Sequence, residues 1–248
     1  NLLAGYRERY GLDALRPARF AVVVYDRKSS YREFESADTG LTGLAAEGHA
    51  VSGVAALVAE GRTADEIAAL LVHELTHLLN RQMFLAPLPA WLEEAIANDL
   101  AYCQIDRLGR LRLATLGGKS FVAERPGAAD QFGRRRFAGT FHIEGPIASL
   151  SLLKRARSDG ELVPLPELMD LTWREFVDPT GRKLRYVQSA FLLRYLLDEL
   201  DPEGFREFLR RFQAGGAADA DALLEALDVD WPTLTSGFEA YVRDHPGR

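Results

Sequence analysis

The chain has 248 residues, of which 47% are hydrophobic, so it can bury a sizeable core as one large domain or as two lobes. Its net charge of −6, built from mixed charges, argues against nucleic acid as the main partner, and its single cysteine excludes an internal disulfide. No stretch is long and apolar enough to predict a transmembrane segment. The chain begins at Asn1 rather than Met, which is consistent with a processed or trimmed, exported or periplasmic protein but identifies no compartment.

The first sixty residues predict short helices and strands in alternation. The segment 20–25 is β-rich and typical of a buried strand, and Tyr31 and Phe34 are spaced as the anchors of a short helix. Glycines divide the segment that follows into short strands and turns. The expected elements, in chain order, are an amphipathic helix at 1–16, a well-buried strand at 20–25, a short helix at 28–36 and short strands within 40–59.

The segment 63–80 predicts an amphipathic helix that carries the pattern H-E-x-x-H. Residues four apart lie on one face of a helix, so His73 and His77 point the same way and can occupy two positions of a tetrahedral Zn²⁺ site. Glu74 can reach a water at the metal without becoming a ligand, which is where a general base is needed. The alternative is a pair of core histidines beside a chance glutamate.

A third ligand is expected from the segment 87–100, which reads as a Pro-bounded loop and a second helix from about Ala90 to Ile105. Glu93 and Glu94 lie in its first turns, where a helix-loop-helix connection can fold a carboxylate back onto the first helix. Two histidines and one glutamate form a recognised catalytic zinc set. The alternative is that these glutamates are solvated charges on the helix surface.

The sequence HELTH followed by LPAWLEEAIA resembles the gluzincin zinc metallopeptidases, and specifically the bacterial peptidase-MA-like domains. The second signature of those domains, W-L-x-E-G-x-A, matches the chain at four positions: Trp91, Leu92, Glu94 and Ala97. Ala95 stands where the family usually has Gly. The resemblance implies that Glu94, rather than Glu93, is the third zinc ligand.

The resemblance also implies a zincin-like α+β fold, with a small N-terminal mixed sheet, active-site helices and a C-terminal α-helical lobe. The implied activity is zinc-dependent cleavage of a peptide or protein substrate, with Glu74 as general base. In gluzincins the substrate lies along a sheet edge just before the zinc helix, which would be 53–58 here. The alternative is that 53–58 is a plain buried strand. They often support a zinc histidine with an Asp four residues after the third ligand. That position is Asn98 in this chain, and the neighbouring Asp99 is the substitute we consider.

The remainder of the chain predicts an insertion and then a helical region. Alternating Arg and Leu at 110–113 indicate a strand within the insertion, and His142 is a candidate substrate contact or an incidental histidine. The predicted helices are 146–157, a short one starting at 165–168, 183–200, 202–213, 217–227 and 232–244. The predicted divisions are an N-terminal lobe at 1–105, an insertion near the cleft at 106–145 and a helical lobe at 146–248.

Tyr186 is a further candidate, because Tyr186-Val187-Gln188-Ser189 resembles the Tyr-x-Gln-Ser helix start of the same family. The resemblance implies that its hydroxyl stabilises the oxyanion of the reaction. The alternative is an aromatic side chain that packs its helix.

Three functions stay open on the sequence. The first is a zinc metallopeptidase of the gluzincin type, and the second is an inactive zinc-binding module that binds a peptide or a cell-wall component. The third is an interaction protein whose H-E-x-x-H pattern is incidental. The sequence identifies neither the substrate nor whether cleavage would be internal or terminal.

Overall fold

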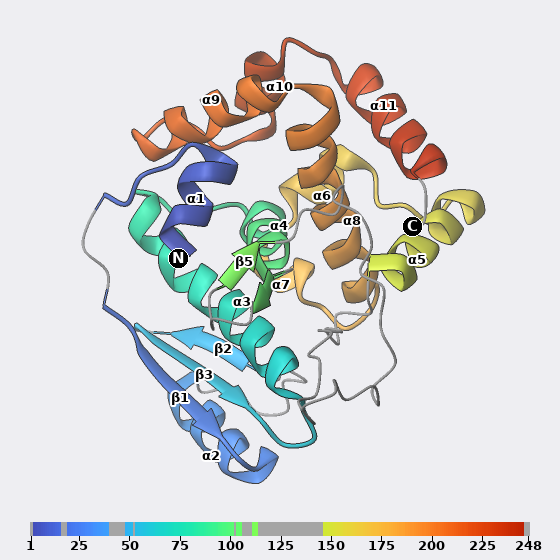
Figure 1. Cartoon of the computed structure of the whole chain (residues 1–248). Helices are drawn as coiled ribbons and strands as arrows, with labels where there is room; N and C mark the ends of the chain where they lie inside the picture. Colours follow the sequence, from blue (N-terminus) through green and yellow to red (C-terminus); the bar gives the residue numbers. More distant parts are fainter. Residues whose placement is uncertain are drawn as a thin grey trace, which may run out of the picture.

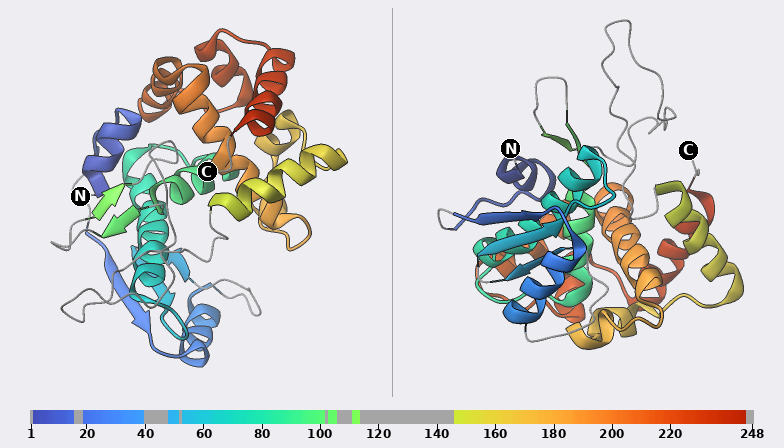
Figure 2. Two further views of the ribbon diagram at one scale, coloured as in Figure 1. Left: turned by 45° about the vertical axis from the view of Figure 1, so that its right-hand side comes forward. Right: turned by 90° about the horizontal axis from the view of Figure 1, so that it is seen from below.

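A computed structural model of the chain describes residues 2–15, 19–39, 48–51, 53–101, 103–105, 111–113 and 146–245. It confirms the predicted α+β class, with a three-stranded mixed sheet near the N-terminus and a mostly helical region after it (Figure 1). The sheet lies at one end of the molecule and the last helices lie at the other (Figure 2).

The sheet is built around strand β3 (Val54–Val58), which pairs in parallel with β1 (Ala21–Tyr25) and antiparallel with β2 (Gly48–Val51). Because side chains alternate across a strand, β3 serves two helices. Ala55 packs with Leu78 of helix α3 (Ala64–Met83), whereas Ala56 packs with Tyr31 of helix α2 (Lys28–Thr39). The sheet is therefore held between α2 and α3.

Two predictions about the strands are wrong. The segment 20–25 was expected to be well buried, but β1 is an edge strand of the described sheet, and Val22 and Val24 are 45% and 49% exposed. The segment 53–58 was expected to be the sheet edge, but β3 is the central strand. The edge nearest α3 belongs to β2, since Gly48 of β2 lies against Glu74.

The predicted start of α3 is confirmed by its capping box, in which Thr63 Oγ1 accepts from the Glu66 backbone N–H and the Glu66 carboxylate accepts from the Thr63 N–H. Helix α1 (Leu2–Tyr10) is shorter than the predicted 1–16 and ends before Gly11, which has a left-handed φ of 69°. The Tyr6 hydroxyl of α1 donates to the side chain of Asn80, so the first helix is fixed on α3.

Helix α4 (Ala90–Ala101) is buried on nearly all sides, with Glu93 its only residue that is partly open to solvent. It ends earlier than the predicted Ile105. The backbone turns instead into a short strand, β4 (Cys103–Ile105), which pairs antiparallel with β5 (Leu111–Leu113). The strand predicted at 110–113 is thus confirmed over residues 111–113. It forms a second, two-stranded sheet with residues 103–105, which were predicted to be the end of the helix.

The region after residue 145 is helical, as predicted. Its helices are α5 (Pro146–Asp159), α6 (Leu165–Asp170), α7 (Trp173–Phe176), α8 (Arg182–Arg194), α9 (Pro202–Gln213), α10 (Ala220–Leu227) and α11 (Trp231–Asp244). The short α7 was not predicted, and α10 begins three residues later than expected. The helix predicted at 183–200 changes after Arg194 from an α-helix to a π-helix, η1 (Tyr195–Leu200). One hydrophobic core runs through these helices and also takes in residues of α1, α3 and α4.

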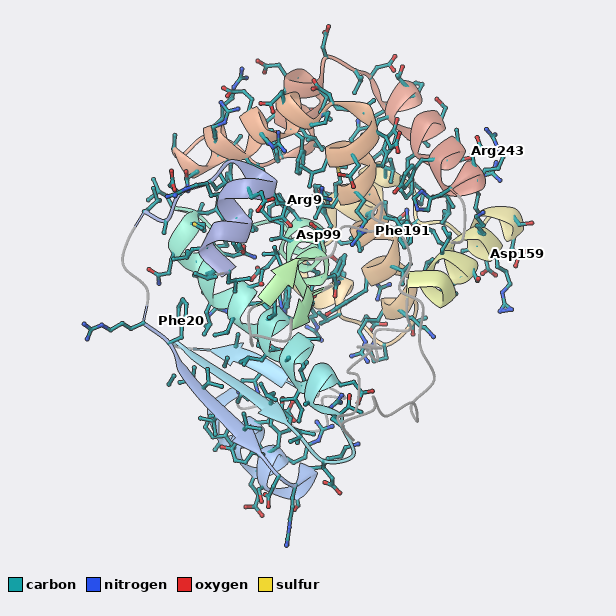
Figure 3. All side chains as sticks on the ribbon, viewed as in Figure 1. Arg9, Phe20, Asp99, Asp159, Phe191 and Arg243 are labelled. Carbon is teal, nitrogen blue, oxygen red and sulfur yellow. The ribbon has the colours of Figure 1, made fainter. Side chains whose placement is uncertain are left out.

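A buried network of charges joins the first helix to this core. Arg9 of α1 and Asp99 of α4, labelled in Figure 3, meet with Nε and Oδ2 3.0 Å apart, and the Tyr10 hydroxyl donates to the same oxygen over 2.8 Å. Arg194 of α8 lies 3.2 Å from the other carboxylate oxygen. Burial acts to raise the pKa of Asp99, but Arg194 and Arg9 outweigh it and hold that pKa below its usual range.

The division into parts at 1–105, 106–145 and 146–248 stays a prediction, because 106–110 and 114–145 lie outside the described residues. His142 lies outside them as well. Across the part of the chain that is described, no helix combines the length and the hydrophobicity needed to cross a membrane.

Candidate metal centre

Helices α3 and α4 bring three potential metal ligands together, as the sequence predicted. His73 and His77 are one helical turn apart on α3, with their Nε2 atoms separated by 3.1 Å. Glu94 approaches both from α4, with Oε2 3.4 Å from His73 Nε2 and Oε1 3.6 Å from His77 Nε2. Among the described residues, these three form a group whose ligand atoms lie within 4.8 Å of one another, close enough to hold one metal ion.

The surroundings of Glu94 fit a cation. Its Oε2 is buried and has no hydrogen-bond partner within the described part of the chain. Burial acts to raise the pKa of Glu94, but His77, His73 and the hydroxyl of Tyr186 outweigh it and keep that pKa low. A buried, ionised oxygen without a donor is costly unless a positive charge faces it. A metal ion between Oε2 and the two imidazoles would supply that charge.

Glu93 supports His77 from the outer side of the ring. Its Oε1 lies 3.1 Å from His77 Nδ1, and its side chain is 17% exposed. A carboxylate accepts, so Nδ1 carries the proton, and in the neutral ring the lone pair is then on Nε2, facing Glu94 and His73. The sequence left Glu93 as a possible ligand or a solvated charge, whereas the structure makes it the partner that fixes the tautomer of His77.

The two residues that we considered for this supporting role are placed differently. Asp99 is engaged with Arg9, Tyr10 and Arg194, as described above. The Oδ1 of Asn98 is buried and has no partner among the described residues, and the same is true of His73 Nδ1. The expectation that Asp99 supports a zinc histidine in place of the family's Asp is therefore wrong, because the turn of α4 directs its carboxylate to Arg9 and Arg194.

Without a metal, the carboxylates around His77 favour its charged form. Burial acts to lower the pKa of His77, but Glu94, Glu93 and Glu74 outweigh it and raise the pKa to about 9. The centre therefore attracts positive charge, either as a proton on His77 or as a metal ion. The two compete for the same imidazole, since a metal ligand must be deprotonated.

Glu74 follows His73 on α3 and is 5% exposed. Burial raises its pKa, and this effect outweighs the opposing charges of His73 and His77. A raised pKa makes the carboxylate a stronger base than an exposed glutamate. Its neighbour across the sheet edge is Gly48, where a Cβ atom would lie only 2.6 Å from Glu74 Oε1. Sequence reasoning used the glycines of this segment only to divide it into strands and turns, and missed this close approach.

Tyr186 reaches the centre from the first turns of α8. Its hydroxyl donates to Glu94 Oε1 over 3.1 Å, and its ring lies 5.3 Å from the ring of Phe176. Burial, followed by the charge of Glu94, raises the pKa of Tyr186, so the hydroxyl keeps its proton and acts as a donor. The hydroxyl thus contacts a predicted ligand and the ring packs against Phe176, whereas a contact of the hydroxyl with a substrate oxyanion stays a prediction.

Trp173 is a neighbour of the centre that sequence reasoning did not single out. It is the first residue of α7, and its ring stands perpendicular to that of His77 with the ring centroids 6.3 Å apart. The pattern Thr172 to Glu175 is a second capping box and does signal a helix start. Nothing in that pattern indicates that the helix docks beside the histidines.

A comparison of the chain with protein-family models, with curated proteins and with solved structures finds no match. The chemistry of the centre therefore has to be inferred from its own residues and their geometry.

Proposed function

We propose that the chain is a zinc-dependent hydrolase of the gluzincin type, with a zincin-like fold, that cleaves peptide or amide bonds. The observation that carries this proposal is the buried group of His73, His77 and Glu94 with Glu74 beside it. Two imidazoles and one carboxylate are a donor set suited to a catalytic zinc ion with an open fourth position. When bound, zinc supplies Lewis acidity, which polarises a scissile carbonyl and lowers the pKa of a water molecule beside it.

The spacing of the donor atoms supports zinc as the metal. Ligand–zinc distances of about 2.0–2.1 Å in a tetrahedral site separate the ligand atoms by about 3.3–3.4 Å. The closest separations here, between His73 Nε2, His77 Nε2 and the oxygens of Glu94, are 3.1, 3.4 and 3.6 Å. A cation could enter without a large rearrangement of the two helices.

In this proposal the chain prepares its ligands through two further contacts. Glu93 holds the proton of His77 on Nδ1, so that Nε2 is the free donor atom. The Tyr186 hydroxyl occupies one lone pair of Glu94 Oε1 and leaves the buried Oε2 turned towards His73. That Tyr186 also donates to an oxyanion of the substrate stays a prediction from the resemblance.

Glu74 is the general base of the proposed reaction. Its carboxylate accepts a proton from the attacking water and later delivers it to the amine of the leaving group. Its raised pKa makes this carboxylate a stronger base than an exposed glutamate, which favours the first step. A peptide substrate would lie along β2 rather than along 53–58, because β2 is an outer strand of the described sheet and its Gly48 lies against Glu74.

The proposal is tested by measuring the metal content of the purified protein together with cleavage of a broad peptide library. We expect about one zinc per chain in the wild type and in Glu74→Gln, and cleavage only by the wild type. Glu225→Gln, in a side chain that is 79% exposed, is the matched control and should behave as the wild type does.

Three results would contradict the proposal in different ways. A wild type that binds no zinc when refolded with it has no metal centre, and an active Glu74→Gln has a different base. Zinc in both proteins with cleavage by neither would favour the inactive zinc-binding module that binds a peptide or a cell-wall component.

A further inference from the structure

Trp173 stands out among the exposed apolar side chains of the described residues because of what it touches. It is 47% exposed, yet its ring contacts the ring of His77, a buried ligand of the candidate metal centre. An exposed indole leaves a large apolar surface in water, which is unfavourable unless something covers it. The centre itself is the place where a substrate would have to lie.

The short helix that carries Trp173 is firmly attached to the site. Four residues cannot form a stable helix in isolation, so α7 depends on its contacts. The Thr172 and Glu175 side chains cap its start, and Phe176 at its end is fully buried. Arg185 Nε donates to the Phe176 carbonyl over 2.8 Å, which ties the end of α7 to α8.

The same contacts couple the position of Trp173 to Tyr186. Phe176 of α7 packs against the ring of Tyr186, whose hydroxyl donates to Glu94. Trp173 is therefore anchored on one side by the helix that touches a predicted ligand and on the other by His77 itself. A rigid aromatic surface of this kind can bind a substrate side chain without first being ordered, which lowers the entropic cost of binding.

We infer that Trp173 is a specificity-determining residue that receives a large apolar or aromatic side chain next to the scissile bond of a peptide substrate. This inference rests on the proposed hydrolase function and names its substrate class. The charge nearby agrees with it, because Glu93 lies 3.1 Å from His77 Nδ1 and would repel an acidic side chain beside that ring. An apolar side chain gains from covering the exposed half of the indole and meets no such repulsion.

The expected size of the effect follows from the exposed area. A Trp side chain buries about 150–250 Å², of which roughly half is open here, and covering it should favour binding roughly 20- to 200-fold. We therefore expect wild-type kcat/KM to be roughly 20- to 200-fold higher for a peptide with Phe beside the cleaved bond than for the same peptide with Ala. A peptide with Glu at that position should be the poorest of the three.

The test compares the three peptides in the wild type, Trp173→Ala, Trp173→Phe and the control Leu85→Ala, which removes an apolar side chain that is 61% exposed. We expect Trp173→Ala to cut the preference for Phe over Ala to about threefold or less, mainly through KM. Trp173→Phe should keep most of the preference, and Leu85→Ala should keep all of it. The turnover of the Ala peptide should change little in Leu85→Ala, because that variant leaves the ligands, Glu74 and Trp173 intact.

A direct binding measurement makes the result independent of turnover. Calorimetric titration of the Glu74→Gln protein with the Phe and Ala peptides should give the same ratio of Kd values, and adding Trp173→Ala should remove it. Zinc content and thermal unfolding of each variant show whether it is folded. Should Trp173→Ala fail that check, Trp173→Leu removes the aromatic ring but keeps an apolar side chain, and the preference for Phe should again fall.

The failure of this inference differs from the failure of the proposed function. A wild type that cleaves no peptide overturns both. A wild type that cleaves peptides while folded Trp173→Ala retains the full preference for Phe, in both turnover and binding, overturns the role of Trp173 alone.

Discussion

Replacement of Gly48 by Ala tests how closely the edge strand β2 positions Glu74. The added Cβ would lie 2.6 Å from Glu74 Oε1 and 3.0 Å from its Cγ and Cδ, which is too close for Glu74 to stay where it is. The backbone of Gly48 is an ordinary strand conformation, so Ala itself fits there. The carboxylate is the flexible partner and has to move by several tenths of an ångström or more.

The displacement of Glu74 should lower both the activity and the stability of the protein. A base displaced by about 1 Å can lose about 100-fold in rate, so we expect kcat of Gly48→Ala to fall between about 10- and 100-fold. Overpacking of this kind costs about 1–3 kcal/mol in the free energy of unfolding. The zinc content should not change, because the three atoms nearest to the new methyl group all belong to Glu74, which is not a predicted ligand.

The assay is peptide cleavage at saturating substrate, measured beside zinc content and urea unfolding. Gly160→Ala is the matched control, because its left-handed φ of 73° makes Ala unfavourable while nothing lies within 4 Å of the added Cβ. It should lose about 1–2 kcal/mol of stability and keep its activity. Full kcat in folded, zinc-loaded Gly48→Ala would refute the idea that Glu74 acts from the position seen in the structure.

Three further predictions concern the charges of the centre and of the core. Glu93→Gln should weaken zinc binding about 10- to 100-fold in competition with a chelator, because the charge that supports His77 is lost, whereas Glu225→Gln should have no effect. Zinc affinity should rise with pH up to about 9, which is the pKa of His77 in the metal-free protein, because zinc must displace the proton of His77. Calorimetry at pH 7 in buffers of different ionisation enthalpy should therefore detect about one proton released per zinc. A pH-independent affinity would contradict this. Asp99→Asn should cost about 3–5 kcal/mol at pH 7, since it removes the buried negative charge that faces both Arg9 and Arg194. Folding lowers the pKa of Asp99, so its contribution to the free energy of unfolding is present above about pH 4 and is lost as the pH falls through the folded pKa. The free energies of unfolding of wild type and variant, measured with urea, should therefore converge in acid.

Local patterns were enough to predict the centre of the site. The start of α3 is encoded by Thr63 and Glu66, and the helical period alone sets His73 and His77 on one face. Local patterns could not choose Glu94 as the third ligand, because Glu93 and Glu94 are adjacent. Only the rotation of α4 against α3 decides which carboxylate faces both imidazoles. The resemblance to peptidase-MA-like domains favoured Glu94, and the structure brings that residue to the histidines.

What the sequence could not predict depends on contacts between distant segments. The run 54–58 is apolar enough for a central or an edge strand, and its place in the sheet is decided by pairing with β1 and β2. Asp99 was taken as a possible partner of a zinc histidine because nothing in its neighbourhood reveals Arg9, ninety residues earlier. Trp173 is next to His77 only because Arg185 and Phe176 dock α7 there.

The burial of α4 also bears on how this protein can change over evolutionary time. The helix carries Glu94 and Asp99, and its alanines at 95 and 97 have no exposed surface that could accommodate larger side chains. Most substitutions along it would therefore disturb folding before any effect on catalysis could be selected. New substrate preferences should arise instead from exposed positions around the centre, where Trp173 can be exchanged without disturbing the core.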